Sequence, residues 1–191
     1  MPSWTDALSQ ALQRRPGRAL DAAGRMRAAV LVPILDRQGE LVLLLTKRTA
    51  HVEHHKGQIS FPGGVHEPAD GTLEGTALRE SREEIGLEPA SVRMLGRLDD
   101  VSPRVTPFVI TPIVAVLRPP EAFRLNPGEV ERILEAPLAP LLQSGGLAEE
   151  SIPLSDGSTV VSRAFRCEGE VVWGATARVV EQLLEVLRGV L

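Results

Sequence analysis

The sequence predicts an α/β fold with helices on both sides of a sheet, and three observations support this class. Strand-like segments occur before and after a helix that contains Glu80, and a long amphipathic helix ends the chain. This order favours a three-layer α/β/α arrangement. The 191 residues are 43% hydrophobic and 24% charged, as is ordinary for a domain with a sizeable core. We expect one domain over residues 1–191, with residues 1–26 as a helical N-terminal extension.

The first expected elements are a short amphipathic helix and a hairpin. Residues 3–12 carry an apolar stripe at helical spacing, and a serine–aspartate capping pair stands at their start. Two apolar runs, at 27–35 and 40–47, are joined by the turn-like sequence DRQG, which predicts paired strands. Their nearly continuous hydrophobicity indicates strands covered on both faces. Residues 51–59 are polar and irregular, which predicts a loop over a site.

Further elements are expected after the helix that contains Glu80. Residues 92–98 and 108–117 are typical of strands, and the region 151–166 favours a hairpin. Residues 131–142 are interrupted by two prolines, and we interpret them as helical or turn-rich. Apolar residues at helical spacing in 176–190 predict the terminal helix.

Three carboxylates lie within five residues in the segment RESREEIGL, at Glu80, Glu83 and Glu84. A helix turns about 100° per residue, so Glu80 and Glu84 point about 40° apart on one face, and Glu83 flanks them. Gly86 supplies the left-handed residue that ends such a helix. Like charges this close repel each other, and a divalent cation that prefers oxygen ligands would remove that repulsion. The pattern therefore indicates a metal site.

The stretch that precedes this helix fits the same purpose. The sequence Pro62-Gly63-Gly64 allows a tight turn and a close approach of the backbone to a ligand. Arg79 and Glu83 are four residues apart and are expected to pair. A solvated acidic helix is the alternative, as for most runs of charge, but the glycine pair at this offset argues against it.

The segment from Gly64 to Leu87 resembles the Nudix box, G-x5-E-x7-R-E-U-x-E-E-x-G-U, in which U is aliphatic. Asp70 stands where the general pattern has Glu, eight residues separate it from Arg79, and Ser81 occupies a U position. The Asp and the extra residue resemble one subgroup, the coenzyme A pyrophosphatases, whose box runs GGxxDxxDx5TALREAxEEIGL.

A second motif of that subgroup, LLTxR[SA]x3Rx3Gx3FPGG, is matched in register from residue 44 to 64. Thr49 replaces Ser or Ala, and Glu53 replaces Arg, which reverses a charge. Two histidines and Lys56 lie beside Glu53, where they would supply positive character. The later sequences NPGEV and WGATA resemble further elements of the subgroup, so the resemblance covers roughly residues 28–185.

The resemblance implies a fold, an activity and a set of site residues. The Nudix fold is an α/β/α sandwich with a mixed central sheet between helices. The subgroup hydrolyses coenzyme A to 4′-phosphopantetheine and adenosine 3′,5′-bisphosphate with Mg²⁺ or Mn²⁺. Here Glu80, Glu83 and Glu84 would be the metal ligands, with Arg79 beside them. The substrate-binding residues would be Thr46, Arg48, Lys56, Gly57, Gly63 and Gly64.

Nudix enzymes often recruit one more carboxylate from a loop beyond the box. Glu121 and Glu129 flank a Pro- and Gly-containing loop here, and Glu131 is a weaker candidate. We expect Glu121 or Glu129 to orient the attacking water. The alternative for Glu129 is a cap on the following segment, and the alternative for Arg48 is a surface ion pair.

Two other functions remain open. The same chemistry on another nucleoside diphosphate conjugate, a sugar or a dinucleotide, is kept open by Glu53. A catalytically silent nucleotide-binding or regulatory module is the other, and the intact acid trio argues against it.

The composition of the chain limits the kinds of partner that we expect it to bind. The net charge of −4 argues against a nucleic-acid or membrane-surface binder, and no apolar run has transmembrane length. The N-terminal residues lack the apolar region of a signal peptide, and Cys167 has no second cysteine for a disulfide. We therefore expect a cytoplasmic protein with a small-molecule substrate. The sequence carries no signal for an oligomeric state.

Overall fold

The computed structural model describes residues 3–49, 57–103, 106–118, 122–143, 147–154 and 156–191. Its α-helices are α1 (Trp4–Arg14), α2 (Leu73–Ile85), α3 (Leu138–Gln143) and α4 (Gly174–Leu187), and its 3₁₀ turns are Pro68–Asp70 and Pro89–Ser91. Its strands are β1 (Met26–Arg37), β2 (Glu40–Arg48), β3 (Ile59–Ser60), β4 (Gly63–Val65), β5 (Val92–Arg97), β6 (Phe108–Leu117), β7 (Val130–Pro137), β8 (Ala148–Pro153), β9 (Thr159–Cys167) and β10 (Glu170–Trp173).

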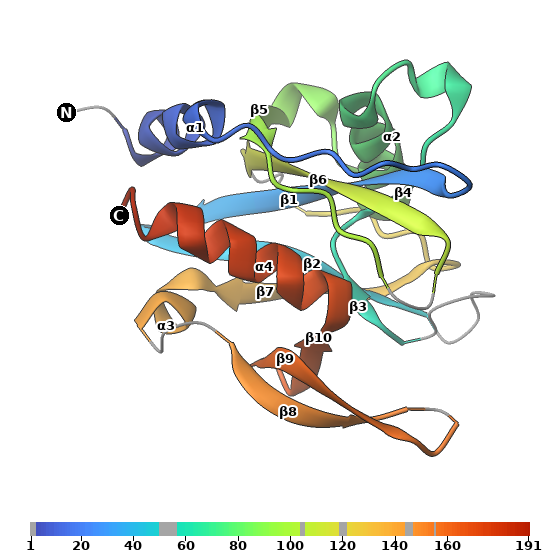
Figure 1. The fold of residues 1–191 in the computed structure, drawn as a ribbon. Coiled ribbons are helices and arrows are strands. Elements are labelled where there is room, and N and C mark those ends of the chain that lie inside the picture. The colour runs from blue at the N-terminus through green and yellow to red at the C-terminus, as the bar shows by residue number, and fades with distance from the viewer. Residues whose placement is uncertain (1–2, 50–56, 104–105, 119–121, 144–146, 155) are drawn as a thin grey trace.

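The described strands form a main sheet of seven strands and a second sheet of three. The main sheet has the order β3-β2-β1-β6-β5, with β4 also paired to β1 and β7 to β2. The β1–β6 pair is parallel, and the other pairs in the main sheet are antiparallel. The sheet is therefore mixed, and it lies between helices, which confirms the predicted fold class. The β8–β9 hairpin extends away from the main sheet at the bottom of the view (Figure 1).

The predicted hairpin at the start of the domain is confirmed. Arg37 pairs with Glu40 across the turn, whose central residues Gln38 and Gly39 both have positive φ. The Asp36 carboxylate accepts a hydrogen bond from the Gly39 amide at 2.6 Å, which closes the turn. The middle of β1 is buried on both faces, as its continuous hydrophobicity predicts.

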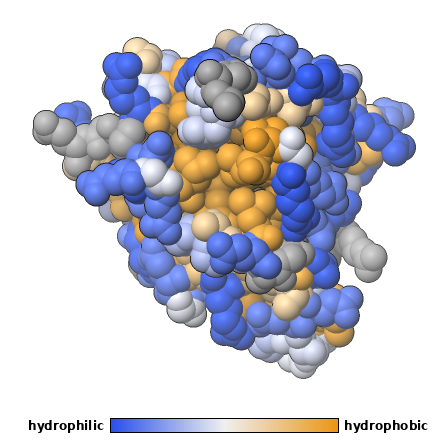
Figure 2. Space-filling view, turned by 90° about the vertical axis from the view of Figure 1, so that its left-hand side faces the viewer, coloured by the Kyte–Doolittle hydropathy of each residue, from blue (hydrophilic) through white to orange (hydrophobic). Residues whose placement is uncertain are grey.

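Two hydrophobic clusters lie on opposite faces of the main sheet. The larger one packs β-strand side chains such as Val32 against α1, α3 and α4, and it includes Leu12 and Leu183. The smaller one packs the other face of β1 and β2 against α2, through Ala77 and Ile85. Seen from the left of Figure 1, where α1 and the end of α4 lie, apolar side chains gather at the centre of the surface within a polar surround (Figure 2).

The N-terminal extension is held against the sheet by close packing and by buried polar contacts. A side chain at Gly96 would meet Leu12 of α1 at 2.8 Å, so the helix lies directly on β5. The Asp100 carboxylate is buried and accepts hydrogen bonds from the Leu20 amide at 2.9 Å and from Thr111 at 2.7 Å. These contacts join the segment after α1 to the sheet that supports the site.

The interpretation of residues 131–142 as helical or turn-rich is wrong for most of this segment. It forms β7, paired with β2, followed by the short helix α3. Val130, Leu134 and Leu138 are all buried, and their spacing of four fits one face of either a helix or a strand. Pro137 is the last residue of β7 and Pro140 lies in the first turn of α3, positions where a missing amide hydrogen is tolerated.

Candidate active site

The acidic segment forms α2, as the sequence predicts. The Thr72 side chain caps its start by accepting from the Gly75 amide at 3.0 Å, and Gly86 ends it in the left-handed conformation, φ 68° and ψ 27°. Ser81 is fully buried and donates to the Ala77 carbonyl at 2.6 Å. Because this hydroxyl is satisfied within the helix, serine fits a position where the motif has an apolar residue.

The two carboxylates one turn apart on α2 lie against the glycine turn. The Glu84 side chain is 3% exposed and that of Glu80 is 16% exposed. Glu84 accepts a hydrogen bond from the Gly63 amide at 3.2 Å. A side chain at Gly64 would stand 2.4 Å from the Glu80 carboxyl carbon, so the glycine is required for this close approach. The structure thus brings together Gly63, Gly64, Glu80 and Glu84.

Burial makes both carboxylates costly as bare anions. It raises the pKa of Glu84 to about 8, opposed by the positive charge of Arg48 and the Gly63 amide, while Glu80 and Glu129 add repulsion. Burial also raises the pKa of Glu80, opposed by Arg79. A buried carboxylate and a partly buried one beside it, both with raised pKa values, fit a hard divalent cation, whose charge would stabilise the ionised forms.

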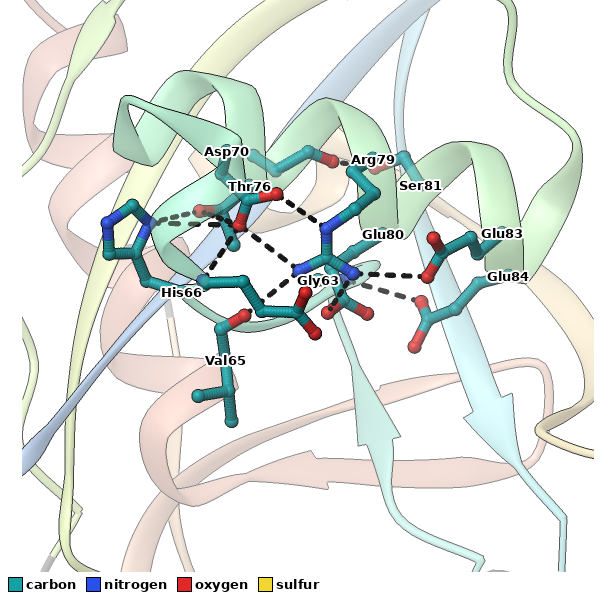
Figure 3. A network of polar contacts seen from close by, with 12 residues as sticks. Gly63, Val65, His66, Asp70, Thr76, Arg79, Glu80, Ser81, Glu83 and Glu84 are labelled. Carbon is teal, nitrogen blue, oxygen red and sulfur yellow. Dashed lines mark hydrogen bonds and ion pairs between the residues drawn. The ribbon is translucent and has the colours of Figure 1, made fainter.

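Glu83 is arranged differently from the other two glutamates. Its side chain is 54% exposed and pairs with Arg79 at 3.1 Å, as the sequence predicts (Figure 3). In the described parts of the chain, no three His, Cys, Asp or Glu side chains are grouped closely enough to hold a metal ion as they stand. As they stand, Glu80 and Glu84 fit a cation, whereas the exposed Glu83 is paired to the same Arg79 nitrogen that contacts Glu80.

Arg79 is the centre of a polar network that fixes the acidic face of α2 (Figure 3). It donates to Asp70 at 2.6 Å and to the Val65 carbonyl at 3.0 Å, and it pairs with Glu80 at 2.9 Å. The Arg79 guanidinium holds the pKa of the buried Asp70 carboxyl well below its usual range. Asp70, which departs from the general motif but matches the coenzyme A subgroup, thus anchors the arginine that orients two glutamates.

Two further residues complete this network: Thr76, which matches the Thr of the subgroup's box, and His66, at a position where that box specifies no residue. The Thr76 hydroxyl donates to Asp70 at 2.8 Å. His66 Nδ1 lies 2.7 Å from the same hydroxyl and 3.7 Å from Asp70. These contacts join β4, the turn at Asp70 and α2, and only the folded chain brings them together.

The loop before β7 wraps the C-terminal end of α2 and carries Glu129 to the site. The Asn126 amide donates to the Glu84 carbonyl at 2.9 Å, and the Asn126 side chain donates to the Glu129 carboxylate at 3.1 Å. Burial is the main cause of the raised pKa of Glu80 and Glu84, and the negative charge of Glu129 adds to it, so Glu129 is near enough to act on both electrostatically. Its carboxylate thus engages the preceding loop, in contrast to the capping alternative. Glu121 lies outside the described residues.

The residues of the second motif, 44–64, differ in how close they lie to the site. Arg48, at the end of β2, contacts Glu84 at 3.3 Å, so it belongs to the site. Thr46 is buried, and its hydroxyl donates to the Ser60 carbonyl at 3.2 Å. Gly57 is exposed and lies just before β3. Lys56 and most of the predicted loop over the site lie outside the described residues.

Comparisons with known proteins agree with this fold and site. The NUDIX domain matches residues 25–146. The chain is 36% identical over 169 residues to the uncharacterized Nudix hydrolase NudL of Salmonella typhimurium, covering 88% of this chain and 86% of that protein, and equally to NudL of Salmonella typhi. The chain belongs to the Nudix family. It is a Nudix hydrolase, and the family typically uses a divalent metal ion.

Two solved structures are similar to this chain. A Caenorhabditis elegans Ap4A hydrolase binary complex has a TM-score of 0.50 and 19% identity, over 62% of this chain and 84% of the other. The Nudix hydrolase RenU of M. smegmatis has a TM-score of 0.50 and 24% identity, over 60% and 71%. At these identities the likeness supports the fold alone. None of the helices in the described parts of the chain has the length and hydrophobicity needed to span a membrane.

Proposed function

We propose that this Nudix hydrolase cleaves the diphosphate of coenzyme A or its derivatives to give 4′-phosphopantetheine and adenosine 3′,5′-bisphosphate. The observation that carries the diphosphate chemistry is the pair formed by the buried Glu84 and the partly buried Glu80, packed against the glycine turn. The choice of coenzyme A is supported by the two motifs that resemble the coenzyme A pyrophosphatases. The proposal treats residues 1–191 as one domain, because α1 shares a hydrophobic cluster with α4.

Glu80 and Glu84 are the residues that would hold Mg²⁺ or Mn²⁺, and Glu83, now paired with Arg79, is the third candidate ligand. A bound divalent cation would neutralise diphosphate charge and lower the pKa of a water ligand. Arg79 holds Glu80 in place through its own anchor on Asp70. Catalysis on this scheme depends on positioning and electrostatics, with no covalent enzyme intermediate.

Substrate and water are assigned to the residues around this pair. We assign the orientation of the attacking water to Glu129, whose charge acts on both Glu80 and Glu84, with Glu121 as the other candidate. The diphosphate is assigned to the Gly63–Gly64 turn, Gly57, Lys56 and Arg48, since a guanidinium suits phosphate oxygens. The Thr46 hydroxyl is already bonded, so Thr46 would act by holding β3 beside the turn.

A second candidate is the same reaction on another nucleoside diphosphate conjugate. Glu53 favours it, because a carboxylate stands where the coenzyme A subgroup has an arginine. A negative charge at this position disfavours the 3′-phosphate, the group that distinguishes coenzyme A from most nucleoside diphosphates.

The two candidates are separated by product analysis on a substrate panel with Mg²⁺ and with Mn²⁺. The panel contains coenzyme A, its dephospho form, a nucleoside diphosphate sugar and a dinucleotide. We expect adenosine 3′,5′-bisphosphate from coenzyme A, and no product with chelator or with Glu84→Gln. Brisk hydrolysis of the sugar conjugate with no cleavage of coenzyme A would establish the second candidate. No hydrolysis of any compound would overturn both.

A further inference from the structure

Two arginines contact the carboxylates of the site, and they are anchored very differently. Arg79 makes five contacts with four residues: two with Asp70, through two different nitrogens, and one each with Val65, Glu80 and Glu83. Its principal anchor, Asp70, is itself held by Thr76 and by the Glu67 amide. Because leaving would break several charge-assisted bonds at once, Arg79 is a fixed part of the scaffold.

Arg48 is held by much less. Among the described residues, its guanidinium has one ion-pair partner, Glu84, at 3.3 Å, a long contact for a charged pair. Its Nε is buried and has no hydrogen-bond partner in the described part of the chain. A buried donor left without an acceptor is unfavourable, so the conformation observed does not satisfy Arg48.

The contact with Arg48 nevertheless offsets part of the unfavourable effect of burying the ionised Glu84 carboxylate. The Glu84 side chain is 3% exposed and has Glu80 and Glu129 as like-charged neighbours. In this environment Arg48 supplies positive charge and the Gly63 amide supplies a hydrogen bond. A divalent cation on Glu80 and Glu84 would replace that positive charge and repel the guanidinium.

We propose that Arg48 is an exchangeable counter-ion, which pairs with Glu84 while no cation is bound and turns to a diphosphate oxygen when a cation takes its place. The inference rests on the proposed metal-dependent diphosphate hydrolysis and adds a coupling between the two ligands. Cation binding frees the guanidinium for the substrate, and the diphosphate removes the guanidinium as a competitor for Glu84. By linkage, each ligand strengthens the binding of the other by the same factor.

The coupling is measured by Mn²⁺ titration with and without α,β-methylene ADP, a diphosphate that resists hydrolysis. Isothermal calorimetry on wild type and Arg48→Gln gives both affinities without turnover. Without nucleotide, we expect Arg48→Gln to bind Mn²⁺ about tenfold more tightly, within the roughly 5–150-fold range of such couplings. We also expect the strengthening of Mn²⁺ binding by the nucleotide to fall by a similar factor. Arg82→Gln, on the exposed side of α2, is the charge-matched control and should match wild type.

Arg48→Lys separates charge from geometry and serves if the glutamine variant unfolds. Lysine keeps the positive charge but lacks the planar fork, so Mn²⁺ affinity should stay near wild type while the coupling to nucleotide falls. Thermal unfolding of each variant confirms that it is folded. If folded variants at position 48 bind Mn²⁺ with unchanged affinity and unchanged coupling, while Glu84→Gln loses Mn²⁺ binding, the counter-ion role is wrong and the proposed function stands. If wild type itself binds no Mn²⁺, both fail.

Discussion

The two faces of the main sheet are built for different purposes. The face covered by α1, α3 and α4 is filled by hydrocarbon, with side chains such as Leu12, Leu183 and Leu184 fully or almost fully buried. The face covered by α2 has a smaller apolar cluster and also buries Ser81 and Glu84 close to the sheet. Burial is favourable for a leucine but unfavourable for a carboxylate. The first face therefore stabilises the fold, whereas on the second face a buried carboxylate lowers stability and places a functional group at the site.

The largest effect is expected from Glu84→Gln on the α2 face. The substitution is nearly isosteric and removes one charge of the proposed metal ligand set, so turnover should fall almost to background. The fold should be as stable or more stable, because a repelling charge is gone. Steady-state kinetics at limiting Mg²⁺, together with thermal unfolding, measure both quantities. Near wild-type activity at limiting Mg²⁺ would contradict the metal assignment.

The next largest effect is expected from the carboxylate that orients water. A general base contributes about 10²–10⁴-fold, so alanine at the functional position should lower kcat by that amount. We expect this for Glu129→Ala, because the charge of Glu129 acts on both Glu80 and Glu84, with Glu121→Ala as the paired variant. The measurement is kcat as a function of pH for both. Losses of less than a few fold in both variants would eliminate the two residues.

The apolar face should respond in the opposite way. Leu183 is fully buried in the cluster formed by α4, so Leu183→Ala should lower the free energy of unfolding by about 2–5 kcal/mol. The site lies on the other side of the sheet, so kcat of the folded enzyme should change little. Denaturant unfolding and kinetics at a temperature where the variant is folded test this. A loss of kcat as large as that of Glu84→Gln would show that the two faces are not separable.

The two faces should also differ in pH dependence when the protein is free of metal. The pKa of Glu84 is raised to about 8 in the fold, above the value of 4.5 for a free glutamate. The contribution of Glu84 to the free energy of unfolding is therefore fully present below pH 4.5 and is lost as the pH rises through about 8. Relative to Glu84→Gln, wild type should lose about 1.4 kcal/mol per pH unit across this window.

The comparison requires denaturant unfolding in chelator at pH 5, 7 and 8.5. The difference in the free energy of unfolding between wild type and Leu183→Ala serves as the control. This difference should be nearly constant over the same pH range. If the free energies of unfolding of wild type and Glu84→Gln differed by the same amount at every pH, Glu84 would not cause the pH dependence of stability.

The smallest effect concerns substrate selectivity. A charge-assisted hydrogen bond to the 3′-phosphate is worth about ten- to a hundredfold in kcat/KM. With Glu53 in place of the subgroup's arginine, coenzyme A should be preferred over its dephospho form by only about tenfold. The substitution Glu53→Arg should increase this preference. Glu53 lies outside the described residues, and kcat/KM for both compounds on both proteins decides the point. An unchanged ratio would remove this position from the specificity of the enzyme.

Local patterns were sufficient for much of the fold. The helix with Glu80 and Glu84 on one face, its end at Gly86 and its pair Arg79–Glu83 all follow from helical periodicity and glycine conformation. The β1–β2 hairpin and the terminal helix were predicted for the same reason, because each is specified by neighbours in the chain. The β7 strand was missed because its buried residues recur every four positions, a spacing that local reasoning assigns equally to a helix.

The sequence by itself determined the acidic helix, the glycine turn and their membership of one family motif. Only the tertiary structure decided that Asp70 anchors Arg79, that Arg48 faces Glu84 and that Glu129 is near enough for its charge to act on Glu84. These contacts join residues that are remote in the chain, and they depend on how α2 is docked and how β2 is aligned with β7. Burial has the same origin: the Glu84 pKa of about 8 arises from packing of the whole α2 face, which no local pattern contains.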